Sequence, residues 1–274
     1  MDALVYNCFI CDINALKPGN VGRHGAGHGM ECADFIKSAE VVTPILCNHR
    51  LGLGERILSS IEATSAAVNC NTNLGMILLV APVIWVFEQL QTPEDFRDAI
   101  KPALKSLGRQ DARDIFTAIR LANPGGLGKV DKYDVNSATD IDIYSAMDAA
   151  KDRDLVALQY VNGYREVVNP GIKCLQNYHN RWNSVEWAVV ACYLMYMASF
   201  PDSHIRRKYG KETAEQVRKK ATPVLAQFGD YDDPGDAEDV LMIFDRELKE
   251  SEINPGTCAD LTVASLLLYR LGVC

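Results

Sequence analysis

Apolar residues recur at helical spacing along most of the chain. In ERILSSIEATSAAVN, residues 55–69, apolar and small side chains fall three or four positions apart, and no stretch of similar length alternates apolar and polar residues. Segments rich in proline and glycine, such as KPGN and DDPGD, separate these runs. The pattern predicts an all-α fold with helices near 2–13, 31–47, 54–70, 73–90, 93–107, 111–122, 140–149, 152–163, 166–180, 183–199, 210–228, 235–250 and 257–272.

Three of the expected segments, at 73–90, 185–200 and 261–273, are apolar on nearly every side, which predicts the centre of a multi-helix bundle. We do not expect the first to cross a membrane, since polar residues precede its apolar part and Pro82 lies within it. No internal repeat or long linker interrupts the chain. We therefore expect one domain covering residues 1–274.

The composition narrows the classes of partner. The chain has 274 residues and a net charge of -8, and its only dense basic patches are the short RRK at 206–208 and RKK at 218–220, which argues against a nucleic-acid partner. The N-terminus MDALVYNCFICDI lacks the basic segment of a secretory signal, so we expect a cytoplasmic protein. The sequence is compatible with a homo-oligomer.

Cysteine usage gives no framework of disulfides. The nine cysteines are odd in number and scattered, as expected of reduced thiols in a large core. Cys8 and Cys11 form a single CxxC pair without a second ligand pair. This favours packing on a helix over zinc binding or redox chemistry.

A glycine-rich segment between two expected helices is the first candidate site. LKPGNVGRHGAGH, residues 16–28, combines four glycines with Lys17, Arg23, His24 and His28. Glycines such as Gly19 let backbone N–H groups turn toward an anion, and the cations supply compensating charge, so the segment suits a polyphosphate. A surface loop with glycines at its turns is the alternative.

A second glycine-rich segment, NPGGLGK at 123–129, lacks the first glycine of a phosphate-binding P-loop and follows no strand. We interpret it as the end of a helix followed by a loop.

A stripe of polar residues follows one helical face. Glu55 and Glu62 are seven residues apart, and Asn69 continues the stripe toward Asn71, Thr72 and Asn73. Such a stripe is usually the solvated face of a helix. Small neighbours and the apolar segment that follows instead suggest an enclosed end, where Glu62 would need Lys, Arg or Mg²⁺ as a partner.

Two further segments combine polar groups with a helix start. In SFPDSHIRRKYG, Asp202, His204, Arg206 and Arg207 crowd together, and Asp202 suits either an N-cap or a site. In NPGTCADL, Thr257 and Asp260 have the spacing of a capping box, which favours a helix start over a site.

Taken in order, these segments resemble the triphosphoribosyl-dephospho-CoA synthase family. The matching residues are LKPGNV at 16–21, the Glu62 helix leading into NTNLG at 71–75, DSHI at 202–205 and NPGTCADL at 254–261, so the resemblance spans nearly the whole chain. It implies an all-α enzyme that transfers the 5-triphosphoribosyl group of ATP to the 2'-hydroxyl of 3'-dephospho-CoA and releases adenine.

The resemblance implies roles for these residues. Lys17, Gly19, Asn20 and Arg23 would hold phosphates, with Mg²⁺ bridged to Glu62 or Asp202. The segment Asn71, Thr72, Asn73 and Gly75, together with Asp260, would bind the nucleotide of ATP. Glu62 or Asp202 would act as a base or steady the ribosyl cation, and His204 would act as the acid.

The chain departs from the better-known family pattern, which has NTHxG, Asp-Thr-Asn and PGGxADL where this chain has NTNLG, DSH and PGTCADL. The NTNLG form is similar to a sister branch of organisms with methanopterin-type one-carbon metabolism. A ribosyl-phosphate transferase with another small-molecule acceptor is therefore one alternative. A non-catalytic helical protein that binds a nucleotide is the second.

Overall fold

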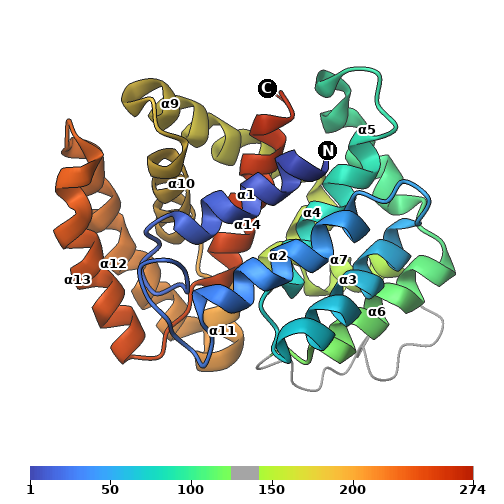
Figure 1. Cartoon of the computed structure of the whole chain (residues 1–274), viewed down its shortest axis with the longest axis horizontal. Coiled ribbons are helices and arrows are strands. Elements are labelled where there is room, and N and C mark those ends of the chain that lie inside the picture. Colours follow the sequence, from blue (N-terminus) through green and yellow to red (C-terminus); the bar gives the residue numbers. More distant parts are fainter. Residues whose placement is uncertain (125–141, 274) are drawn as a thin grey trace.

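The computed structural model describes residues 1–124 and 142–273 (Figure 1). Over these residues the chain is helical and has no β-strand, which confirms the all-α prediction. The elements are α1 (Asp2–Asn14), α2 (Cys32–Leu46), α3 (Leu53–Val68), α4 (Leu74–Phe87), η1 (Pro93–Asp95), α5 (Phe96–Lys105), α6 (Arg109–Ala122), α7 (Ile143–Ala150), α8 (Leu155–Asn162), η2 (Val167–Gly171), α9 (Ile172–Trp182), α10 (Val185–Ser199), α11 (Ser203–Tyr209), α12 (Lys211–Asp230), η3 (Pro234–Ala237), α13 (Glu238–Glu250) and α14 (Gly256–Arg270).

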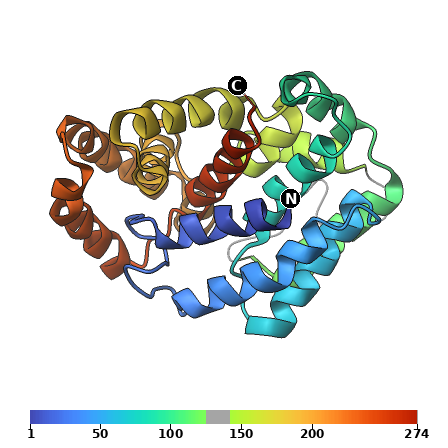
Figure 2. The ribbon, with the colours of Figure 1, turned by 45° about the horizontal axis from the view of Figure 1, so that its top comes forward.

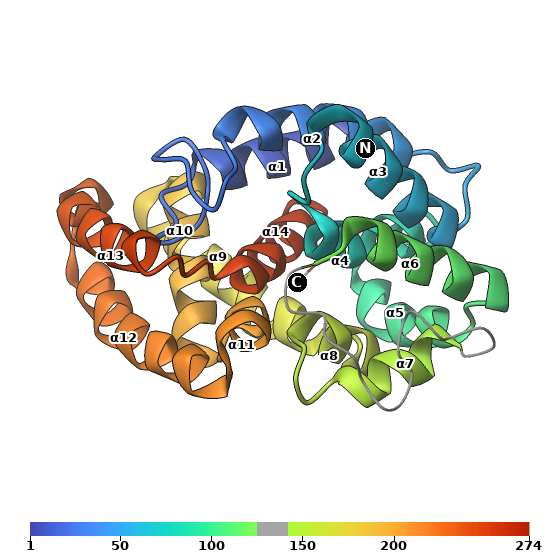
Figure 3. The ribbon, with the colours of Figure 1, turned by 90° about the horizontal axis from the view of Figure 1, so that it is seen from below.

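The three apolar helices lie inside the bundle, as predicted. Most residues of α4, α10 and α14 are buried. Helix α4 packs against α14 in the middle of the molecule, with α2 and α3 on one side of the pair and α8 and α11 on another (Figures 2 and 3). Helices α12 and α13 form one end of the molecule. The first turns of α4 and α14 are thereby brought to the same place.

Pro82, in the centre of α4, leaves carbonyl groups of the preceding turn without their usual hydrogen-bond donors, and two tyrosines supply donors instead. Pro82 has no N–H group and its ring is incompatible with the usual hydrogen bonding of the preceding turn. The hydroxyls of Tyr160 and Tyr164 donate to the carbonyls of Leu78 at 2.8 Å and Leu79 at 2.9 Å. These two bonds attach α4 to the segment that begins with α8, and they fix one wall of the site.

The observed helices differ from the predicted ones in several places. The predicted helices at 93–107 and 235–250 each begin with a short 3-10 turn, η1 and η3. The predicted helix at 166–180 is divided into η2 and α9, because Pro170 interrupts regular hydrogen bonding. Helix α11 was not among the expected helices, since seven residues are too few to show periodicity. No helix in the described parts of the chain is long and apolar enough to cross a membrane.

Candidate active site

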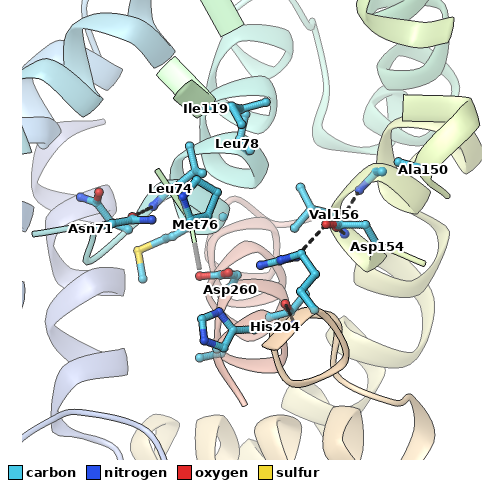
Figure 4. A pocket seen from close by; sticks show the side chains of 18 of the residues that line it. Asn71, Leu74, Met76, Leu78, Ile119, Ala150, Asp154, Val156, His204 and Asp260 are labelled. Atoms are coloured by element: carbon cyan, nitrogen blue, oxygen red, sulfur yellow. Dashed lines mark hydrogen bonds and ion pairs between the residues drawn. The ribbon is translucent and has the colours of Figure 1, made fainter. Parts of the chain in front are cut away.

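A cavity of about 500 Å³ lies where the first turns of α4, α11 and α14 meet α6, α7 and α8 (Figure 4). Both polar and apolar side chains line it. The polar lining consists of Asp12, Asn20, Asn71, Thr72, Asn73, Arg153, Asp154, His204, Arg206, Arg207, Asn254, Thr257 and Asp260.

Asp260 lies near the start of α14, just after its first turn, and packs directly on Gly75 in the first turn of α4. A Cβ atom added at Gly75 would lie 2.1 Å from Oδ2 of Asp260, which is far inside contact distance. Glycine at this position therefore lets the carboxylate sit against the backbone of α4. The NTNLG and NPGTCADL segments, which are distant in sequence, are joined by this contact.

The carboxylate of Asp260 is isolated from donors. It accepts no hydrogen bond and forms no ion pair with any residue that the structure describes. Burial raises its pKa well above the ordinary value of 3.8, and the negative charges of Asp202 and Asp12 raise it further. Asp260 is thus suited to carry a proton under conditions where most carboxyl groups have lost theirs. It is not the capping residue that the Thr257 spacing suggested.

His204 lies beside Asp260 on the same side of the cavity (Figure 4). Its backbone N–H donates to Oγ1 of Thr257 at 3.1 Å, which ties α11 to α14. Burial lowers the pKa of the imidazole, although the charge of Asp202 acts in the opposite direction. Near neutral pH the ring is therefore mainly neutral and can donate at one nitrogen and accept at the other.

The segment Asn71 to Asn73 forms the entry to α4. Oδ1 of Asn71 accepts from the N–H of Leu74 at 3.1 Å, and Thr72 shares a 2.7 Å hydrogen bond with Ser38. Nδ2 of Asn73 donates to Thr64 at 3.0 Å, whereas its Oδ1 is buried without a hydrogen-bond partner among the described residues. A ligand hydroxyl or amino group would satisfy this oxygen.

Three arginines near the cavity were not predicted as ligands. Arg153, Arg206 and Arg207 all line it, and Arg207 forms an ion pair with Asp154 at 2.8 Å. Arg206 and Arg207 were visible in the sequence as part of a basic cluster, whereas Arg153 and Asp154 gave no sign beyond a possible helix start. The fold brings these cations together because α11 contacts the beginning of α8, where Ser203 accepts from the N–H of Leu155 at 2.7 Å.

The remaining wall is apolar. It is formed by side chains of α4, α6, α7 and α8, and the close-up shows Leu78, Ile119, Ala150 and Val156 facing the cavity (Figure 4). The residues involved looked like ordinary core positions in the sequence. Nothing in their spacing distinguishes an apolar residue that faces a ligand from one that faces a neighbouring helix.

The glycine-rich segment 16–28 contributes less than predicted. Only Asn20 and Met30 extend from this region into the cavity, and Nδ2 of Asn20 donates to Asn254 at 2.9 Å. Gly19 has φ of +80° and donates its N–H to Asp245 of α13 at 2.8 Å. Its conformational freedom therefore serves packing against α13 rather than an anion-binding nest.

The two cations of that segment are also placed differently. Lys17 is 4% exposed and forms an ion pair with Asp12 at 2.5 Å, so its ammonium group is not available at the surface of the cavity. The side chain of Arg23 is exposed and does not line the cavity. Neither observation supports the expected phosphate contacts.

Glu62 and Asp202 do not form the expected Mg²⁺ site. Glu62 is exposed on α3 and is absent from the cavity lining, so the enclosed end that we expected for its helical face is wrong. The buried Asp202 accepts from Ile205 N–H at 3.0 Å and from Cys258 N–H at 2.8 Å, which uses both carboxylate oxygens. The N-cap interpretation of Asp202 is confirmed. The described residues contain no group of three His, Cys, Asp or Glu side chains suited to a metal ion.

The cysteine pair lies away from the cavity in α1. Burial raises the pKa of Cys8 to about 12 and that of Cys11 to about 11, so both thiols stay protonated. Protonated, buried thiols agree with the prediction that Cys8 and Cys11 pack on a helix. The second glycine-rich segment, 123–129, falls mostly outside the described residues, although Pro124 lines the cavity.

The distant segments that meet in this cavity are those that carried the resemblance to a known family. The family model CitG, described as ATP:dephospho-CoA triphosphoribosyl transferase, matches residues 2–274. The chain belongs to this family. No curated protein and no solved structure matches it.

The CitG family is a transferase family whose substrates are ATP and dephospho-CoA. The match covers both sides of the cavity, including the α4 and α14 turns that meet at Gly75 and Asp260.

Proposed function

We propose that this protein transfers the 5-triphosphoribosyl group of ATP to the 2'-hydroxyl of 3'-dephospho-CoA and releases adenine. The observation that carries this proposal is the isolated carboxylate of Asp260, which faces a cavity lined by both polar and apolar side chains. Breaking a ribosyl–adenine bond requires an acid for the departing base. It also requires separate places for a flat apolar ring and for a polyphosphate.

The apolar wall suits the adenine ring. Leu78, Ile119 and Val156 offer flat contact area without polar atoms that would compete for the ring nitrogens. Asp260 lies across the cavity from this wall in the close-up (Figure 4). We assign to Asp260 the delivery of a proton to a nitrogen of adenine as the bond to C1' of the ribose breaks.

The arginines suit the triphosphate. Guanidinium groups bind phosphate oxygens through paired N–H donors, and Arg153, Arg206 and Arg207 supply several such groups on one side of the cavity. Free backbone N–H groups in the first turn of α4 carry the partial positive charge of the helix dipole, which attracts a phosphate. These groups take the place of the phosphate ligands that the sequence suggested in residues 17–23.

His204 and the carboxamides suit the sugar. A neutral imidazole beside Asp260 and the unpartnered Oδ1 of Asn73 can accept from ribose hydroxyls. Orientation of the ribose by such contacts lowers the barrier because the reacting atoms are held in place before bond cleavage. We propose no step through a metal ion, since Glu62 and Asp202 do not provide a site for one.

The test is to incubate the protein with ATP, Mg²⁺ and 3'-dephospho-CoA and to follow adenine by chromatography and the acceptor by mass spectrometry. We expect adenine and a triphosphoribosylated acceptor in equal amounts. Adenine that forms only with a different hydroxyl compound would favour the alternative acceptor. If ATP shifts the unfolding temperature but no adenine appears with any acceptor, the protein is a non-catalytic nucleotide-binding protein.

A further inference from the structure

Asp12, in the last turn of α1, has two carboxylate oxygens in different surroundings. Oδ2 contacts Nζ of Lys17 at 2.5 Å, whereas Oδ1 has no hydrogen-bond partner among the described residues. The residue is 3% exposed and still lines the cavity. A buried carboxylate oxygen without a donor is costly, so Oδ1 is suited to a ligand that donates a hydrogen bond.

Lys17 controls the charge of this carboxylate. Burial raises the pKa of Asp12 above its ordinary value of 3.8, and the charge of the Lys17 ammonium group opposes that rise without reversing it. The two side chains are 1% and 4% exposed, so water screens their attraction poorly. Lys17 thus favours the ionised form of Asp12 from a position behind it, outside the lining of the cavity.

Asp12 and Asp260 differ in their partners. Both residues line the cavity, and the negative charge of Asp12 is among the causes that raise the pKa of Asp260. Asp12 has a cation in contact, and Asp260 has neither an ion pair nor a hydrogen bond from the described residues. The cation beside Asp12 therefore favours a negative charge on Asp12 over one on Asp260, and an acid and base pair requires such a difference.

We propose that Asp12 is the general base of the transfer, that its Oδ1 takes the proton of the acceptor hydroxyl, and that Lys17 is a positioning residue that keeps Asp12 ionised. This inference rests on the proposed function. The bond between C1' of the ribose and adenine breaks, and its electron pair leaves with adenine, which takes a proton from Asp260. The acceptor oxygen forms the new bond to C1' and gives its proton to Asp12. Asp12 then releases its proton to solvent and Asp260 takes one up, which returns both groups to their starting states.

The test compares wild-type protein with the double variant D12N/K17M. Substitution of Asp12 alone would leave a buried ammonium group without a partner, so the double variant removes both charges and keeps the size of the pair. With the fold checked by circular dichroism and ATP binding by thermal shift, we expect kcat to fall about 100-fold or more while the KM for ATP changes little. A folded double variant that keeps kcat within about threefold of wild type would overturn the proposal, because the pair would then be structural.

The pH dependence supplies a second measurement that does not depend on the double variant. In the wild-type protein, kcat should fall toward acidic pH as Asp12 takes up a proton. In K17M this acidic limb should move to higher pH, because loss of the ammonium group raises the pKa of Asp12. A wild-type kcat that stays constant toward acidic pH while the protein remains folded would overturn the proposal.

Two controls separate the sources of failure. If the wild-type protein forms no adenine with any acceptor, the proposed function fails. If the wild-type protein is active and D12N/K17M is equally active, only the role of Asp12 fails. A double variant whose activity returns at higher Mg²⁺ concentration would also overturn the proposal, since Asp12 would then be a metal ligand.

Discussion

A Cβ atom at Gly75 would lie 2.1 Å from Oδ2 of Asp260, so the first turn of α4 and the acid that we propose touch without room for a methyl group. We expect Gly75→Ala to displace the carboxylate and to lower kcat about 100-fold, because proton transfer requires hydrogen-bond geometry. Steady-state adenine release measures this. Gly52→Ala is the matched control, since Gly52 has φ of -66° and the nearest atom to its Cβ would be 3.8 Å away. Equal activity of both variants would contradict the assignment.

The raised pKa of Asp260 predicts a conflict between activity and stability. Below the ordinary value of 3.8 the group is protonated in both the folded and the unfolded protein and has no effect. As pH rises, the unfolded chain loses this proton first, so the folded state becomes relatively less stable until the pH passes the folded pKa. Asp260→Asn should therefore raise the unfolding temperature near neutral pH, and this gain should disappear in acid.

The same variant should lose transferase activity. Glu62→Gln serves as its control and should keep kcat within about twofold of wild type, because Glu62 is exposed and does not line the cavity. Calorimetry across pH together with adenine release checks both expectations. A variant at Asp260 that is less stable at neutral pH would show that the carboxylate has a donor that the structure does not provide.

Arg206 should contribute to binding of the triphosphate rather than to bond cleavage. We expect Arg206→Met to raise the KM for ATP about tenfold, which corresponds to about 1.4 kcal/mol, with kcat changed little. Lys208→Met is the control, since Lys208 is an exposed neighbour on the same helix and does not line the cavity. Similar effects of the two substitutions would mean that only the general charge of α11 matters.

Asp202 should matter for stability. Its carboxylate accepts from the N–H groups of Ile205 and Cys258 and so joins the first turns of α11 and α14. We expect Asp202→Ala to lower the free energy of unfolding by about 2–4 kcal/mol, because a helix cap is lost and a buried donor is left without a partner. Urea denaturation measures this. A loss of activity without a change in the free energy of unfolding would instead favour the catalytic role that the sequence suggested.

Much of the fold could be predicted because helical periodicity is a local property. The three apolar helices stood out because residues such as Ile77 and Leu79 are buried all round α4. Helix α11 was missed because it is short. Its N-cap, Asp202, was the only local sign of a helix start. The partner tyrosines of Pro82 are more than seventy residues away, and no local pattern connects them.

The candidate site was only partly predictable, because contacts between residues far apart in the sequence leave no local pattern. Asn71, Asn73, His204 and Asp260 were found as polar groups at helix starts, and all four line the cavity. Glu62 was misjudged because a carboxylate on a helix gives no local sign of which face is buried. Asp12 looked like an ordinary polar residue in an apolar helix, and only the fold shows that it reaches the cavity with one oxygen unsatisfied.

A single reaction of wild-type protein with ATP, Mg²⁺ and 3'-dephospho-CoA, run in parallel with Asp260→Asn, tests whether Asp260 is the acid of a triphosphoribosyl transfer. Adenine and the mass of the acceptor are followed together. We expect one adenine for each acceptor molecule that gains a triphosphoribosyl group, and neither product with the variant. Wild-type protein that binds ATP and yields no adenine, or a variant as active as wild type, would contradict this expectation.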